Sequence, residues 1–311
     1  MPEHHSGQGR PHPPTAAAIL LSLLTVFTLL VTLPGTAAAV ARIDDRPTHP
    51  EQDWMGSTIR AHEGERGPAA KGSSLPDPSP PGLPMAGPPA GPAAGPPASA
   101  SVSATVNGVD VSSHNGNVAW SKLWNSGVRF AYAKATEGTS YTNPYFAQQY
   151  NGPYDAGMIR GAYHFALPNN SGGGAQADYF VRHGGGWTDD GWTLPGVLDM
   201  EYNPYGSTCY GLSAGRMIDW IEDFLDAYRD HTGRDAVIYT STAWWKKCTG
   251  NYGGFGKYNP LWVPRYGSSS GELPNGWGFY TFWQHTNTGP TVGDHDRFNG
   301  SYDRLEALAY D

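Results

Sequence analysis

The sequence predicts a (β/α)8-like barrel with some helices short or missing, formed by residues 102–311 of the 311-residue chain. Beyond Val102, short apolar or β-branched runs alternate with helical patterns, which is typical of βαβ units around a parallel sheet. All 18 Tyr and most Trp and Phe also lie there, and aromatic surface on that scale can build a core. Because this part is near the lower size limit for such a barrel, roughly 200 residues, we expect several thin crossovers.

Eight candidate strands account for the barrel. They are expected at 108–111, 130–133, 161–165, 196–200, 236–240, 261–264, 279–284 and near Asp296. The clearest helix runs from Ser213 to Asp230, where apolar residues recur with helical spacing and Gly233 follows as a stop signal. Other crossovers are weaker: Gly152-Pro153 interrupts the stretch 143–158, and 253–259 is too short and Gly-rich for a full helix.

Residues 1–41 have the pattern of an export signal. The apolar run from Ala16 to Leu33 is followed by small residues that offer cleavage sites ending at Ala39 or Ala41. An uncleaved anchor is the alternative, because this run is nearly long enough to span a bilayer. With cleavage, we expect a secreted monomer that keeps no stable membrane association.

Residues 42–101 are predicted to be a disordered linker rich in Pro, Ala and Gly. The segment contains Trp54 as its only aromatic residue, so it lacks the apolar surface needed to offset the entropy of ordering. Within it, Asp53–Gly56 forms a small island whose role stays open between a docking or processing element and part of a passive tail.

Charge and motif searches exclude several classes of protein. The chain carries 20 Lys and Arg against 28 Asp and Glu, a net charge of −8, without a basic cluster, so nucleic acid is not an expected partner. Binding to an anionic polymer would therefore need a shaped groove. There is no phosphate-binding loop, dinucleotide fingerprint or zinc motif, and the histidines are scattered, so we expect no cofactor and no metal. The two cysteines, Cys209 and Cys248, are expected to form a disulfide in an oxidising compartment.

Asp199 and Glu201 are the strongest candidates for catalysis. They end an apolar run, and residues two apart in a strand point to the same face. At the carboxyl rim of a barrel, such a pair suits glycosidic cleavage, because burial and a neighbouring charge raise one pKa into the range of a general acid. The alternative is structural: an Asp that caps a loop and a Glu paired with a surface Arg.

Further acids and aromatics follow other strands. Asp110, Glu137 and Asp296 are predicted to converge on the same rim, where so many like charges are costly unless they serve a function. Tyr163, Tyr239 and Trp283 are the aromatic residues we favour for binding sugar rings, although packing in the core or rim is the general alternative.

Together these motifs resemble the glycoside hydrolase family 25 lysozymes, over essentially all of Val106–Asp311. The resemblance rests on Gly108–Ser112, Lys134–Gly138, Arg160–Phe165, Asp199–Glu201 and Phe282–Gln284. It implies an N-acetylmuramidase that cuts the β-1,4 bond between N-acetylmuramic acid and N-acetylglucosamine in the glycan strands of peptidoglycan, outside the cell at the wall.

The resemblance also implies a role for each acid. Glu201 matches the proton donor, and Asp199 matches the residue that assists the substrate acetamido group as an internal nucleophile, with retention of configuration. Asp110 and Asp296 match further active-site acids, and Glu137 matches a signature position of unsettled role. Two alternatives stay open: a chitinase-like or hexosaminidase barrel, and a wall-binding protein without turnover.

Overall fold

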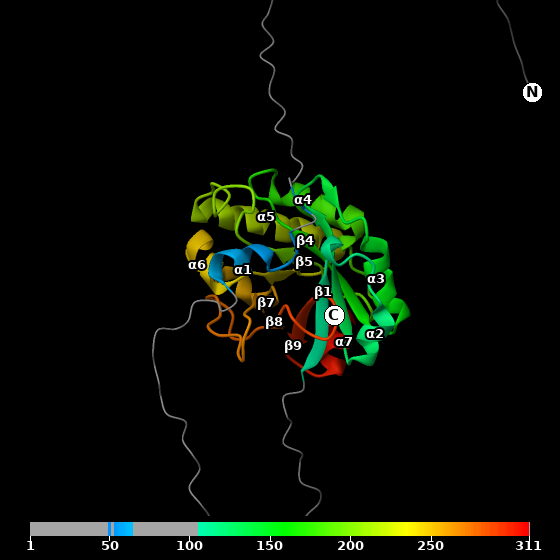
Figure 1. Cartoon of the computed structure of the whole chain (residues 1–311). Coiled ribbons are helices and arrows are strands. Elements are labelled where there is room, and N and C mark those ends of the chain that lie inside the picture. The colour runs from blue at the N-terminus through cyan, green and yellow to red at the C-terminus, as the bar shows by residue number, and fades with distance from the viewer. Residues whose placement is uncertain (1–48, 51–52, 65–104, 311) are drawn as a thin grey trace, which may run out of the picture. The chain divides into compact units, whose positions relative to one another are not determined.

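The structure is a computed structural model, and it describes residues 49–50, 53–64 and 105–310. Within these residues the strands form one sheet in the order β1-β9-β8-β7-β6-β5-β4-β2-β3, and β1 also pairs with β2, which closes the barrel (Figure 1). The strands are β1 (Val106–Val111), β2 (Phe130–Glu137), β3 (Tyr141–Thr142), β4 (Ile159–Phe165), β5 (Val197–Asp199), β6 (Val237–Tyr239), β7 (Leu261–Pro264), β8 (Phe282–Thr286) and β9 (Asp294–Phe298).

The eight predicted strands are present, but the predicted sheet direction is wrong at its last member. β9 runs antiparallel to both of its neighbours, β1 and β8. The short strand β3 folds back on β2 as a hairpin and lies outside the closed ring. Because β9 enters the barrel from the opposite end, its first residue lies at the end of the barrel where β1 finishes.

Most helices on the outside are short, as expected. They are α2 (Trp120–Asn125), α3 (Phe146–Asp155), α4 (Gly173–Phe180), α6 (Thr242–Thr249) and α7 (Tyr302–Tyr310), with a 3-10 turn at Gly254–Lys257. α3 continues through Pro153, against the expected interruption, and ends two residues later at Asp155, so the helix loses only the one hydrogen bond that an N–H at position 153 would make.

The long helix α5 (Ala214–Thr232) confirms the periodic pattern. Its buried stripe consists of the predicted residues, Met217, Trp220, Ile221, Phe224, Leu225 and Tyr228. Ser213 caps the first turn and Gly233 ends the helix with φ of 72°. α4 packs closely on α5 at Gly173, where a Cβ would lie 2.2 Å from the Trp220 carbonyl oxygen.

Aromatic side chains fill the barrel. Tyr132, Trp262 and Phe282 are fully buried, and their ring centroids lie 4.9 to 5.7 Å apart in tilted and edge-on pairs. The expected disulfide joins Cys209, in the loop after β5, to Cys248 of α6, with 5.4 Å between their Cα atoms. In the part of the chain that the structure describes, no helix is long and apolar enough to cross a membrane.

The prediction of a disordered linker is wrong for residues 53–64. Residues 57–63 form helix α1 (Ser57–Glu63), and Met55 and Ile59 are buried in the same core cluster as the barrel residues. Apolar surface for ordering this segment is supplied by the barrel, which an argument from local composition does not count. The predicted signal segment and the rest of the linker lie outside the described residues.

A buried histidine makes folding stability depend on pH. His164 of β4 contacts Thr136 Oγ1 at 2.8 Å and Gln176 Oε1 at 2.9 Å, and burial lowers its pKa to about 4. In the unfolded chain the histidine has its ordinary pKa of 6.5, so between pH 6.5 and pH 4 it is protonated in the unfolded chain and neutral in the folded one. The contribution of His164 to the free energy of unfolding is therefore complete above pH 6.5. The protein loses about 3 kcal/mol of stability at this residue as the pH falls towards 4.

Urea unfolding at pH 7 and pH 4.5 tests this assignment when the loss of stability between the two pH values is compared for the wild type and the variant His164→Asn. We expect the wild type to lose more stability than His164→Asn over this interval, because acids with raised pKa affect both proteins alike. Equal pH dependence in the two proteins would contradict the assignment.

Candidate active site

The predicted acid pair lies at the end of β5. Asp199 is the last residue of the strand, Glu201 follows two positions later, and both are fully buried. Burial and then the charge of Glu201 raise the pKa of Asp199 well above its usual range. Burial also raises the pKa of Glu201, while hydrogen bonds from residues 56–59 act against this rise. Both carboxyls therefore hold a proton more strongly than an ordinary exposed carboxyl does.

Asp110 is brought to the same end of the barrel by β1. Its Oδ2 accepts a hydrogen bond of 2.8 Å from Gln284 Nε2. Burial, followed by the charges of Asp296 and Asp294, raises the pKa of Asp110 well above its usual range. Asp199 adds to this rise, which places Asp110 within the field of the β5 acids.

Asp296 lies deeper in the barrel than predicted. In the antiparallel register, Asp294 pairs with Asp110, whereas Asp296 pairs with Gly108, two residues further from the rim. The rim acid contributed by β9 is therefore Asp294, which the sequence analysis missed. Burial raises the pKa of Asp294 to about 7. The alternation of buried and half-buried residues along β9 places Asp294 and Asp296 on the same inward face.

Glu137 forms a buried ion pair with Lys134 of the same strand. Residues three apart normally face opposite sides of a strand, but a register shift between Lys134 and Thr136 brings the two side chains together. Tyr205 also donates a hydrogen bond of 2.7 Å to Glu137. Burial raises the pKa of Glu137 to about 7, against the opposing charge of Lys134. In this structure Glu137 fixes the Lys134 ammonium at the inner wall of the site.

Of the three favoured aromatics, two point into the site. Tyr163 and Tyr239 are fully buried, and the Tyr239 hydroxyl donates a hydrogen bond of 2.9 Å to Gln284 Oε1. Trp283 lies elsewhere: its Nε1 donates to the Arg265 carbonyl at 2.8 Å, and its ring packs under Arg297. Successive residues of β8 alternate between faces, so Gln284, not its neighbour Trp283, joins the acids.

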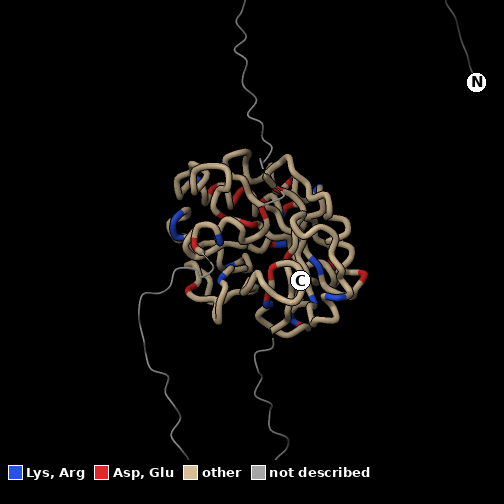
Figure 2. Tube along the Cα trace, viewed as in Figure 1, with Lys and Arg blue, Asp and Glu red and all other residues tan. Residues whose placement is uncertain are grey.

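Part of the site is an open hollow. A cavity of about 410 Å³ is lined by Asp110, His114, Asn115 and Asp294 on the barrel side, and by Trp54 and Arg60 on the side of residues 53–64. Lys and Arg are spread along the trace without one dominant patch in the view of Figure 2. Buried carboxyls and the hydroxyl and amide groups of Tyr163, Tyr239 and Gln284 thus define the chemistry of this end of the barrel.

A barrel with a buried carboxyl pair at the end of β5, surrounded by tyrosine hydroxyls, defines a glycoside hydrolase. The sequence profile of the glycosyl hydrolases family 25 matches residues 109–294. The chain belongs to this family.

Relatives of the chain agree with this assignment. Lysozyme M1 from Streptomyces globisporus is 42% identical over 317 aligned positions, which cover 99% of both chains. An N,O-diacetylmuramidase from a Chalaropsis species is 48% identical, over 66% of this chain and 99% of its own length. Among solved structures, a muramidase from Acremonium alcalophilum is 53% identical with a TM-score of 0.65, over 66% of this chain and 99% of that chain.

Proposed function

We propose that this protein is a secreted lysozyme that hydrolyses the β-1,4 bond between N-acetylmuramic acid and N-acetylglucosamine in peptidoglycan. The observation that carries the proposal is the buried pair Asp199 and Glu201 at the end of β5, with Asp110 in the same electrostatic environment. The names of the relatives, lysozyme and muramidase, support the substrate class.

In the proposed mechanism Glu201 is the general acid. A carboxyl with a raised pKa holds its proton at the pH of the reaction and delivers it to the leaving sugar oxygen. Asp199 orients the acetamido group of the substrate, whose carbonyl oxygen attacks the anomeric carbon and forms a cyclic intermediate. Water then opens this intermediate with Glu201 acting as base, so the configuration is retained.

The other polar residues position the reacting groups in this proposal. Asp110 holds Gln284, whose amide also contacts Tyr239, so these side chains form one connected wall. Asp296 lies below Asp110 in the barrel, and its interaction with Asp110 helps to raise the pKa of Asp110. Tyr163 contributes a hydroxyl to the same wall, and Glu137 keeps the Lys134 ammonium in place.

Product analysis tests the bond that is cut. Because residues 53–64 cover Glu201, the chain is first cut between residues 65 and 104 by a site-specific protease and separated from its N-terminal fragment. The separated enzyme then digests purified peptidoglycan, and the products are reduced with borohydride and identified by mass spectrometry. We expect reduced muramic acid at the new ends. Reduced glucosamine would assign the opposite bond, and no new reducing ends would favour a wall-binding protein.

A further inference from the structure

Residues 53–64, here called the plug segment, lie directly on the proposed proton donor. The main-chain N–H of Gly56 donates to Glu201 Oε1. Glu201 Oε2 accepts from the Thr58 main chain at 3.0 Å, the Thr58 hydroxyl at 2.7 Å and the Ile59 main chain at 3.2 Å. One carboxylate therefore receives four hydrogen bonds from three residues of the plug segment, Gly56, Thr58 and Ile59.

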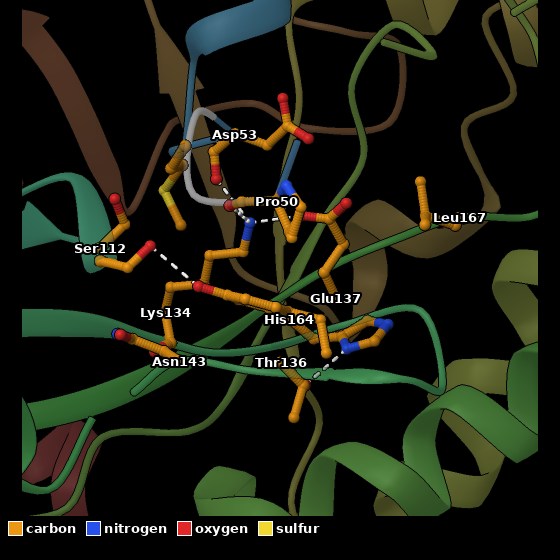
Figure 3. A network of polar contacts seen from close by, with 12 residues as sticks. Pro50, Asp53, Ser112, Lys134, Thr136, Glu137, Asn143, His164 and Leu167 are labelled. Carbon is orange, nitrogen blue, oxygen red and sulfur yellow. Dashed lines mark hydrogen bonds and ion pairs between the residues drawn. The ribbon is translucent and has the colours of Figure 1, made fainter. Parts of the chain in front are cut away.

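The inner part of the groove is occupied by the main chain around Met55. Its N–H donates to the Tyr163 hydroxyl at 3.2 Å, and its carbonyl accepts from Gln284 Nε2 at 3.1 Å. Lys134 Nζ donates to the carbonyls of Asp53 at 2.5 Å and Pro50 at 3.2 Å, as Figure 3 shows. The hydroxyl of Tyr205 also contacts a carboxyl oxygen of Asp53. Tyr163, Gln284 and Lys134, which belong to the wall of the proposed site, thus hold peptide groups of the chain itself.

The outer part of the segment is fixed at its far end. Glu63 accepts hydrogen bonds from the hydroxyls of Tyr202 at 2.8 Å and Ser241 at 2.5 Å. The ring of His62 stacks on Tyr202 with 4.3 Å between centroids. In Figure 1, helix α1 lies across the strands of the barrel, and its hydrogen bonds to Glu201 place it over the end of β5.

We propose that the plug segment is an intramolecular inhibitor, and that the enzyme becomes active when the segment leaves the groove. This inference rests on the proposed function for its activity readout. It assigns the island Asp53–Gly56 as a docking element.

The contacts explain why occupancy prevents catalysis. A general acid must come within hydrogen-bond distance of the leaving oxygen, and the oxygens of Glu201 are already taken by donors from the plug segment. Those donors stabilise the charged form of Glu201 and so oppose the rise in its pKa that burial causes. Met55 and Ile59 bury apolar surface against the barrel, and this hydrophobic burial adds to the affinity of the plug segment for the groove. Because the segment is tethered, its effective concentration at the groove is on the order of millimolar, so even modest affinity keeps the site closed.

Coverage of the relatives is consistent with a separable segment. Lysozyme M1 from Streptomyces globisporus aligns over 99% of this chain, so its sequence extends across the N-terminal third as well. The muramidase from Acremonium alcalophilum matches 66% of this chain with 99% of its own, which is about the share that the barrel contributes. A barrel of this length therefore has a folded counterpart without the plug segment.

The first test compares the full chain before and after cutting. A recognition sequence for a site-specific protease is placed between residues 65 and 104, and release of soluble fragments from peptidoglycan is measured. We expect the uncut chain to be at least about 10-fold less active than the cut enzyme freed of its N-terminal fragment, given the tethered concentration. Equal and measurable activity of the two forms overturns the proposal.

A matched pair of glycine variants tests the docking contact itself. Gly56 has φ of 90°, and a Cβ there would lie 2.6 Å from Gln284 Oε1 and 2.7 Å from the Tyr239 hydroxyl. Gly64 also has a left-handed φ, of 76°, but a Cβ there meets nothing within 4 Å. We expect Gly56→Ala to raise the activity of the uncut chain towards that of the cut enzyme, and Gly64→Ala to leave it near the wild-type level. No difference between the two variants overturns the proposal. After cutting and separation, all three proteins are the same enzyme.

A binding experiment separates failure of this inference from failure of the proposed function. A synthetic peptide of residues 49–64 is titrated into the cut enzyme by calorimetry. If neither form degrades peptidoglycan, the function is wrong, but binding of this peptide and loss of binding with its Gly56→Ala version still support a plugged groove. Absence of binding at millimolar peptide overturns the inference, whatever the activity.

Discussion

Replacing Glu201 by Gln is expected to lower glycan hydrolysis by the cut enzyme about 10²- to 10⁴-fold, the range associated with loss of a general acid. The amide has nearly the shape of the carboxyl group but cannot give up a proton to the leaving oxygen. Substrate affinity and thermal stability should change little, because the substitution removes a buried group with a raised pKa and introduces no charge. The measurement is kcat and KM on soluble peptidoglycan fragments, together with the melting temperature.

Glu272→Gln provides the matched control. Glu272 is exposed and pairs with Lys246 at 2.7 Å. The same chemical change there should leave kcat within about twofold, since exposed ion pairs contribute little. A Glu201→Gln enzyme that keeps more than a tenth of the wild-type kcat would remove Glu201 from the role of proton donor.

The strands and three of the rim acids could be predicted from the sequence. A two-residue period indicates both where a strand lies and which of its side chains share a face. Asp199 and Glu201 end an apolar run, and Asp110 follows another, so parity and position alone place them together. The direction of a strand leaves no such trace. An alternating run reads the same for a parallel or an antiparallel strand, and the choice moves the rim position from Asp296 to Asp294.

The alternation of side chains along β8 also explains why Gln284, and not the predicted Trp283, lies in the site. Phe282 and Trp283 are both large and apolar, so the run does not show which of them faces the interior. Packing of Phe282 on Trp262 and Tyr132 fixes Phe282 inside the barrel. Gln284 then has the same orientation, and Trp283 lies on the outer face. Aromatic character alone was too weak a signal for a sugar-binding residue.

The plug segment could not be predicted from local composition. A seven-residue helix has almost no stability alone, because nucleation fixes several residues for few hydrogen bonds. Its helix forms only where Glu201 and the buried pocket for Met55 and Ile59 receive it. The one sequence signal was an aromatic and apolar island, Asp53–Gly56, in an otherwise polar and Pro-rich stretch.

Removing the disulfide should cost the largest single share of folding stability. Cys209 and Cys248 are 39 residues apart, and the chain-entropy model gives about 4 kcal/mol for closing a loop of this length in the unfolded chain. We expect Cys209→Ala with Cys248→Ala to lower the unfolding free energy by that amount in urea titrations of the cut enzyme at pH 7. The single variant Cys209→Ala is the control, because it loses the cross-link but keeps the buried Cys248 sulfur.

The two variants separate the cross-link from packing. If loop entropy dominates, the single and double variants lose nearly the same free energy of unfolding. The difference between the two losses measures the contribution of the packing contacts of Cys248. The loop that begins after β5 carries Tyr202 and Tyr205, which line the groove beside Glu63 and Glu137. Loss of the cross-link should therefore raise KM more than it lowers kcat, because Glu201 lies only two residues past the end of β5 and stays close to the strand. A loss below about 1 kcal/mol would mean that the unfolded chain already holds these cysteines close together.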